Sequence, residues 1–336
     1  MRKKINIHGL ILLAILICHS AFAELGADWT QATDSANWTA RHSHAATVFD
    51  GKMWILGGSD STSLKSDVWY STDGTSWTAT TSSALWTPRE DHTAVAFDGK
   101  LWVIGGYTTG GAIGDVWSST NGKDWVQVKS LTSWGKRYDH TSVVFDGKMW
   151  VIGGLKTNGT SERMKDVWYS TNGVDWTQAT SSALWVGRID HTSVVFDNKI
   201  WVLGGAMYNP SGNDRLNDVW SSQDGASWSE VGYGGWTSRN SHCSAVYDNK
   251  IWVFGGNIGG FSPFVNDVWH STNGADWIEA TDSANWSKRW EFASVVFDNK
   301  IWVFGGALSV IGPSTVIEND VWWTDIHSSV DNWEMY

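Results

Sequence analysis

The chain contains 336 residues, and its 35 acidic side chains outnumber the 24 lysines and arginines, which gives a formal net charge of −11 at pH 7. This acidic balance argues against nucleic acid or an anionic membrane surface as the partner, because both carry negative charge. It leaves neutral sugars, cationic groups and basic proteins as candidate ligands.

Residues 1–23 have the pattern of a secretory signal peptide. A basic start at residues 2–4 precedes an apolar run at residues 10–18 and a small-x-small cleavage site at residues 21–23. The apolar run is too short for a membrane span. A lipoprotein signal would acylate Cys18, but Ile17 stands where that signal requires a small side chain. We therefore expect cleavage after residue 23, a secreted or periplasmic protein, and no membrane insertion afterwards.

Residues 24–336 consist of a unit that recurs six times at intervals of 48 to 51 residues. Two short apolar runs, such as 141–145 and 149–152, flank an Asp-Gly pair, a pattern that predicts a tight β-hairpin. A second hairpin is expected at Asn172-Gly173, with its last strand from Asp175 onward, so each unit predicts four antiparallel strands. The markers of the unit are an arginine (Arg41, Arg89, Arg137, Arg188, Arg239 and Arg289) and, sixteen residues later, the first glycine of a Gly-Gly pair (Gly57, Gly105, Gly153, Gly204, Gly255 and Gly305).

A period near fifty residues with four strands and a Gly-Gly pair in each unit resembles the kelch repeat. The resemblance covers nearly all of residues 24–336, and it includes the fold of the central domain of galactose oxidase. It implies an all-β chain folded as a single domain, a six-bladed kelch β-propeller with four antiparallel strands per blade. The resemblance specifies the fold far better than the function.

Tryptophan occupies four recurring positions in the unit, which account for 24 of the 27 tryptophans. Two of these positions, in the fourth strand and in the link to the next unit, lack one member each at the C-terminal end. The missing pair is Trp29 and Trp38, because residues 26–29 and 33–38 repeat the pattern of residues 274–277 and 281–286. We therefore expect the N-terminal strand to complete the last blade and close the ring, with Trp333 as a competitor for that position.

The two faces of the expected disc differ. One face carries the short Asp-Gly, Asp-Asn and Asn-Gly turns, whose positive φ angles explain their composition. The other face carries loops of 8 to 13 residues with unrelated sequences, and such loops usually hold the function of a repeat protein. In kelch adaptor proteins this face holds a peptide, with arginines two positions past the repeated arginine. Here those positions are Ser43, Asp91, Asp139, Asp190, Ser241 and Glu291, so the anionic-peptide specificity is not implied.

The sixth unit departs from the pattern at Trp290, Glu291 and Phe292. An aromatic ring beside a carboxylate at the mouth of a channel is suited to stacking on and hydrogen-bonding to a sugar or a cation. Alternatively, the two aromatic residues simply seal the closing blade. The candidate ligand-binding residues are Trp290, Glu291, Asp139, Asp190, Asp91, Tyr138, Tyr107 and Tyr208.

Three other recurring or isolated residue types are interpreted as structural. The histidines at His44, His92, His140, His191 and His242 are expected to make hydrogen bonds between blades rather than to bind a metal. The repeated arginines are expected to brace the links by pairing with carboxylates. Cys243 is expected to be a small buried residue, and it would be the single cysteine of the mature chain.

Two functions remain open at this point. The first is a non-catalytic secreted or periplasmic module, a monomer that binds an extracellular protein or glycan with the variable face. The second is a carbohydrate-active enzyme, a sugar mutarotase or epimerase, because secreted kelch propellers include such enzymes. A copper-radical oxidase is disfavoured, since its site needs a Tyr cross-linked to a Cys, a second Tyr and two His, whereas Cys243 is the only cysteine of the mature chain and no Tyr-His pair occurs. The sequence contains no phosphate-binding loop, zinc-protease motif or nucleophile elbow, and we expect no cofactor and no metal.

Overall fold

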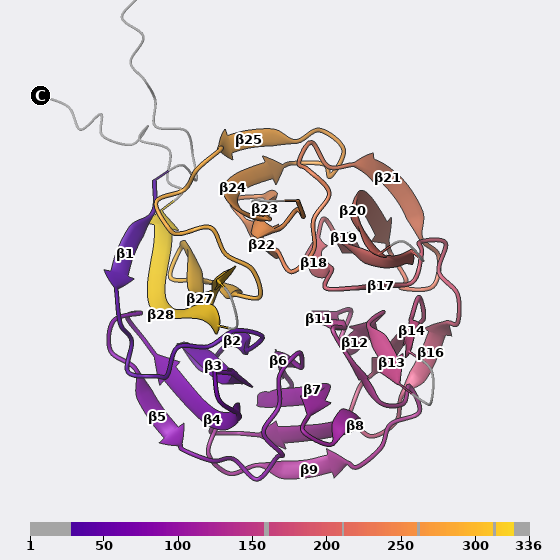
Figure 1. Cartoon of the computed structure of the whole chain (residues 1–336). Coiled ribbons are helices and arrows are strands. Elements are labelled where there is room, and N and C mark those ends of the chain that lie inside the picture. Colours follow the sequence, from indigo (N-terminus) through magenta and orange to yellow (C-terminus); the bar gives the residue numbers. More distant parts are fainter. Residues whose placement is uncertain (1–27, 158–160, 210–211, 261–262, 312–313, 326–336) are drawn as a thin grey trace, which may run out of the picture.

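The computed structural model describes residues 28–325, with gaps at 158–160, 210–211, 261–262 and 312–313 (Figure 1). The expected signal peptide lies outside the described residues. The described chain is all-β and contains no helix, so it offers no helical segment long and apolar enough to cross a membrane. Figure 1 shows the sheets arranged around a central axis, as expected for a β-propeller.

Antiparallel sheets of four successive strands recur along the described chain. For convenience the repeats are numbered one to six from their leading arginines. Their sheets are β2–β5 (Ala45–Phe49, Lys52–Ser59, Leu64–Ser71, Thr78–Thr81), β6–β9 (Thr93–Phe97, Lys100–Thr108, Gly111–Ser119, Val126–Lys129), β11, β12, β15 and β16 (Thr141–Phe145, Lys148–Ile152, Val167–Ser170, Thr177–Thr180), β18–β21 (Thr192–Phe196, Lys199–Asn209, Gly212–Ser222, Ser229–Tyr233), β22–β25 (Cys243–Tyr247, Lys250–Asn257, Phe264–Ser271, Ile278–Thr281), and β26, β27, β28 and β1 (Ala293–Phe297, Lys300–Ile311, Ser314–Asp325, Thr30–Thr33).

Short strands extend the third and fourth repeats on the loop side. Strands β10 (Arg137–Tyr138), β13 (Leu155–Thr157) and β14 (Ser161–Arg163) form a small separate sheet, and β17 (Arg188–Ile189) pairs with β19. Much of what the sequence suggests to be loop is in fact hairpin, since β27 and β28 remain paired as far as Ile311 and Ser314. The variable face therefore carries extended hairpins as well as loops.

The first strand of each sheet lies nearest the axis (Figure 1). These innermost strands contact their neighbours in chain order, from β2 through β6, β11, β18 and β22 to β26, and β26 contacts β2 again. The N-terminal strand β1 pairs with β28, where Gln31 lies opposite Trp322, and Thr324 Oγ1 donates a hydrogen bond of 2.7 Å to the Asp28 carbonyl. Trp333, the alternative partner for this position, lies outside the described residues.

The buried arginine of each repeat organises the packing between strands. In repeat three the guanidinium of Arg137 is fully buried, and it donates to both carboxylate oxygens of Asp166 at 2.8 and 2.9 Å and to the Gly153 carbonyl at 3.0 Å. The same guanidinium lies 5.5 Å from the ring centroid of Trp134, and Asp166 also accepts a hydrogen bond from Trp168. Equivalent buried pairs are Arg41–Asp67, Arg89–Asp115, Arg188–Asp218, Arg239–Asp267 and Arg289–Asp320. These arginines brace the links, as the sequence predicts.

The Gly-Gly pairs leave room for the buried histidines. A Cβ on Gly154 would lie 2.7 Å from the Cβ of His140, and a Cβ on Gly153 would lie 2.9 Å from the ring of His191 in the next repeat. The His191 ring bonds through Nε2 to the Thr141 hydroxyl of the preceding repeat, at 3.1 Å. His140 and His242 make the same contact with Thr93 and Thr192. These three histidines therefore join neighbouring repeats, as expected.

The two predicted turn types behave differently. Asp146 and Gly147 have φ angles of 49° and 65°, as a tight two-residue hairpin requires. The Asn172-Gly173 turn is wider than predicted, because its strand β16 begins at Thr177 and only Gly173 has a positive φ. Here the Ser170 hydroxyl accepts a hydrogen bond from the Gly173 amide, and the Asn172 side chain accepts hydrogen bonds from two amides further on, so side chains rather than ladder bonds shape this turn.

Candidate functional site

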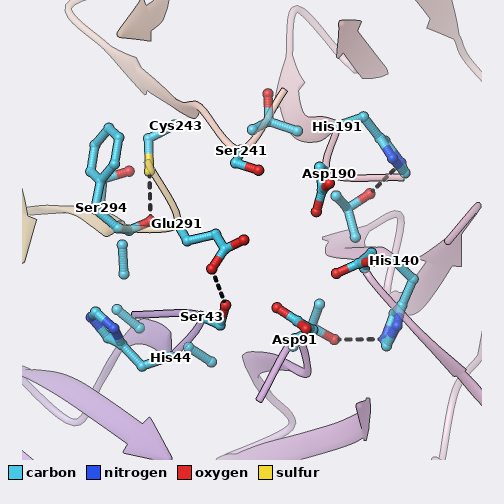
Figure 2. A pocket seen from close by; sticks show the side chains of 18 of the residues that line it. Ser43, His44, Asp91, His140, Asp190, His191, Ser241, Cys243, Glu291 and Ser294 are labelled. Carbon is cyan, nitrogen blue, oxygen red and sulfur yellow. Dashed lines mark hydrogen bonds between the residues drawn. The ribbon is translucent and has the colours of Figure 1, made fainter. Parts of the chain in front are cut away.

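A cavity of about 280 Å³ lies on the central axis, lined by the innermost strands and the residues that precede them (Figure 2). Each repeat contributes four consecutive residues, such as Asp139 to Ser142 in repeat three. The first of the four is the acidic or serine position identified in the sequence, and the second is the buried histidine or Phe292. The last two are small residues, mostly Thr, Ser and Ala. Because strand one starts on the loop side, the carboxylates lie toward the variable face.

The six residues at the first position form an axial ring, defined as Ser43, Asp91, Asp139, Asp190, Ser241 and Glu291. All six adopt φ angles between 50° and 53°, a left-handed conformation that Asp tolerates better than most side chains. Their backbones are joined between repeats: the amide of Ser43 donates to the carbonyl of Glu291 at 2.9 Å, and Ser241 donates to Asp190 at 2.9 Å. The same contact links Asp91 to Ser43, Asp139 to Asp91 and Glu291 to Ser241. The backbone therefore fixes where these side chains begin.

Glu291 is held on the side of the axial ring where both neighbours are serines. Its Oε2 accepts a hydrogen bond from the Ser43 hydroxyl at 2.7 Å and lies 2.7 Å from Nδ1 of His42. Burial alone would lower the pKa of His42, but the hydrogen bond and the negative charge of Glu291 outweigh it and raise that pKa. His42 stands one position past the repeated arginine, and an alignment of the repeats by that position could have identified it.

The three aspartates lie on the other side of the axial ring. Burial, together with repulsion from Glu291 and from one another, raises the pKa values of Asp91 and Asp139 well above the ordinary range. Burial and the charge of Glu291 likewise raise the pKa of Asp190 to about 6, although the Asn240 side chain donates to it at 3.1 Å. Asp139 and Asp190 also act on each other, and the charge of Asp190 contributes to the raised pKa of Asp139. The aspartates resist full ionisation because they repel one another in a buried setting.

The aromatic candidates lie outside this cavity lining. Tyr107 and Tyr138 pack together with ring centroids 4.9 Å apart, and burial with the nearby charge of Asp139 raises the pKa of Tyr138 to about 12. Trp290 stacks on Phe264 of the preceding repeat, with an interplanar angle of 3° and centroids 5.6 Å apart. Tyr208 is 68% exposed, and Arg163 lies over its ring. The structure thus brings the four acidic candidates together and separates them from Trp290 and Tyr208.

His44 is a feature of the site that the sequence does not reveal. Its side chain lines the cavity (Figure 2), it is only 6% exposed, and neither ring nitrogen has a hydrogen-bond partner among the described residues. The cause lies in repeat six, which lies beside repeat one and carries Ala293. Three other repeats have a threonine at this position, and its hydroxyl bonds to the histidine of the next repeat. His92, which follows Ala45 in the same way, lies beside the backbone of Leu56, and neither of its ring nitrogens has a hydrogen-bond partner among the described residues either. The hydrogen bond between repeats that the sequence predicts is therefore missing for His44 and His92. The consequence of having Ala instead of Thr at this position is visible only in the contact between repeats.

The cavity offers oxygen acceptors and neutral imidazoles rather than an arrangement for metal binding. Burial lowers the pKa values of His44 and His140 below the ordinary value, helped by the buried arginine of each repeat. Within the part of the chain that the structure describes, no group of three or more His, Cys, Asp or Glu side chains could hold a metal ion. Cys243 is buried, donates to the Phe292 carbonyl, and has its pKa raised by burial to about 12, so its thiol is unreactive.

Comparison with known proteins gives two matches. A family model described as the KLHDC2/KLHL20/DRC7 Kelch-repeats domain matches residues 26–205 and again residues 139–335. The tRNA wybutosine-synthesizing protein 2/3/4 of Oryza sativa subsp. japonica is 39% identical over 72 residues. That similarity covers 20% of this chain and 7% of the rice protein, so it concerns a small part of either chain.

Proposed function

This chain belongs to the kelch-repeat family, and from that premise we propose that it is a non-catalytic, exported propeller that binds a protein ligand with its variable face. The export part of the proposal is supported by the basic, apolar and small-residue segments of residues 1–23. A glycan is the other ligand class that the acidic, aromatic-rimmed face would accommodate, and the experiment below separates the two.

The propeller in this proposal has six blades, and β1 closes the ring. Support comes from the pairing of β1 with β28 and from the contact between β26 and β2. Trp29 also makes the edge-to-face contact with Trp286 that Trp176 of repeat three makes with Trp134 of the link before that repeat, at 5.8 Å in both cases. Ring closure would protect sheet edges from pairing with other chains.

The observation that carries the binding proposal is the position of the axial cavity. It begins on the face where the hairpins between the second and third strands differ in every repeat, whereas the turns of the opposite face repeat one pattern. Tyr107 and Tyr208 are exposed on this variable face. Exposed tyrosines supply apolar area with a polar tip, which is typical of protein interfaces.

The test uses residues 24–336 as bait for exported proteins, in parallel with a glycan array. Tyr107→Ser combined with Tyr208→Ser should abolish capture of the partner without changing the melting temperature. Asp98→Asn combined with Asp197→Asn, which changes the turns of the opposite face, is the matched control and should retain capture. Equal capture by both variants would refute the use of this face, and binding on the glycan array alone would make the ligand a sugar.

The enzymatic alternative is tested with the same preparation. Paired carboxylates can act as general acid and base, so interconversion of sugar anomers by the pure protein would replace the binding proposal by a sugar-isomerising activity. In that case Asp139→Asn should abolish turnover, while the opposite-face control remains active.

A further inference from the structure

We infer that the axial cavity receives the ammonium or guanidinium group of a basic side chain carried by the protein partner. This inference rests on the proposed binding function and specifies the part of the ligand that enters the cavity. It combines the charge of the lining, an unsatisfied buried imidazole and the narrow entrance.

The lining is acidic and contains no basic side chain. Asp91, Asp139, Asp190 and Glu291 face one cavity, and none of the described residues that line it is Lys or Arg. The repeated arginines are turned away from the axis, because each is paired with its own buried aspartate. A cation entering the axial ring would meet Glu291 on one side and the carboxyl groups of the three aspartates on the other, and its positive charge would favour their ionised form. Charge-assisted hydrogen bonds of this kind are among the strongest in proteins.

Groups just outside the cavity adjust this charge without neutralising it. His42 is hydrogen-bonded to Glu291, and Arg163 is near enough to Asp190 to act on its charge, while Glu90 adds a further carboxyl group beside His42.

The unpartnered imidazole of His44 is an independent sign that the cavity is suited to a polar ligand. A buried polar group without a hydrogen-bond partner destabilises the folded state, so such groups are usually satisfied by something. His140, His191 and His242 are bonded to threonine hydroxyls, whereas Ala293 and Ala45 leave His44 and His92 without one. Because the imidazole of His44 is neutral, it can accept a hydrogen bond from a cationic donor that enters beside it.

The entrance favours a slender group over a sugar ring. Five of the six neighbouring pairs in the axial ring are joined by a backbone hydrogen bond. Residues joined by one such hydrogen bond have Cα atoms about 5 Å apart, so a ring of six measures roughly 10 Å between opposite Cα atoms. Side chains occupy part of that width, and the hydrogen bonds between the backbones of the axial ring oppose its widening. A methylene chain ending in a cation fits such an entrance better than a pyranose does.

The experiment uses defined probes rather than an unknown partner. n-Butylammonium and n-butylguanidinium represent the lysine and arginine side chains, 1-butanol is the neutral control, and glucosamine represents an amino sugar. Binding is measured by calorimetry and by the NMR signal of the His44 Cε1–H group. That signal is assigned with His44→Phe, a change that places the residue of repeat six in repeat one.

Both cationic probes should bind and shift the His44 signal, while 1-butanol should do neither. Asp139→Asn combined with Asp190→Asn should weaken cation binding at least tenfold, and Asp98→Asn with Asp197→Asn should leave it unchanged. Equal binding of butanol, equal affinity in the cavity variant, or an unmoved His44 signal would overturn the inference. Tighter binding of glucosamine than of n-butylammonium would also overturn it in favour of an amino sugar.

The partner assay separates this inference from the proposed function. A partner that is lost with the Tyr107 and Tyr208 variant but kept by the Asp139 and Asp190 variant would refute cation insertion and leave the binding function intact. Cation binding to the cavity without any partner sensitive to the tyrosines would refute the proposed function instead.

Discussion

Replacing Asp190 by asparagine should stabilise the protein at neutral pH. Burial and the charge of Glu291 raise the pKa of Asp190 from 3.8 to about 6, so the folded state holds the proton more tightly than the unfolded chain does. Well below pH 3.8, Asp190 is protonated in both the folded and the unfolded state, so its burial causes no electrostatic loss of stability. As the pH rises toward 6, the unfolded chain releases its proton first, and the folded state loses about 1.4 kcal/mol per pH unit.

The loss amounts to about 3 kcal/mol and persists above pH 6. An asparagine side chain at this position would be neutral at every pH and could still accept the hydrogen bond from Asn240. Asp190→Asn should therefore raise the free energy of unfolding by up to ~3 kcal/mol at about pH 7.5, or the melting temperature by about 6 °C, with no gain at about pH 3.5. The assay is thermal and urea denaturation at both pH values.

Asp197→Asn is the control, because it removes the same charge from an exposed turn. It should change stability little at either pH. If Asp190→Asn destabilises the protein at neutral pH, or stabilises it equally in acid, then the carboxylates of the axial ring are not under electrostatic stress and the reasoning about the cavity is wrong.

Three further predictions concern the packing. Gly74→Ala should destabilise the protein severely, because the added Cβ would lie 2.1 Å from a tryptophan ring of another repeat. Gly51→Ala, at a similar φ, meets open space and should lower the free energy of unfolding by only about 1 kcal/mol. Chemical denaturation of both variants measures the difference. Trp29→Ala should cost about 3–5 kcal/mol by removing a buried ring between β1 and the fifth repeat, and a melting temperature equal to that of the wild type would show that β1 contributes nothing to the fold. Ala293→Thr should stabilise the protein by about 1 kcal/mol, provided that its hydroxyl reaches His44 as Thr141 reaches His191; a neutral or destabilising result in urea would contradict that geometry.

The repeating part of the structure could be predicted because one local environment dictates one residue type. The arginine, the Gly-Gly pair and the Asp-Gly turn each recur where backbone geometry or a buried charge requires them, so their spacing alone predicted the strands. The wider turn at Asn172-Gly173 was mispredicted, since its hydrogen bonds to Ser170 depend on side-chain geometry that the dipeptide does not encode.

The site was predicted less completely because its contacts join distant repeats. The acidic positions could be aligned, and they do line one cavity. The contact of His42 with Glu291 spans 249 residues, and the isolation of His44 depends on a missing hydroxyl in another repeat. Trp290 was selected for its departure from the pattern, but only the structure shows that Phe264 covers one face of its ring.

The antiparallel pairing of β1 with β28 has a mechanical consequence. Thr30 lies opposite Trp323, so the N-terminal end of β1 and the C-terminal end of β28 leave the sheet at the same edge. A tensile load applied to both ends would peel this ladder open one hydrogen bond at a time instead of shearing all of its bonds together. We therefore expect the pairing of β1 with β28 to resist such a load less than it would resist a load that shears the two strands past each other.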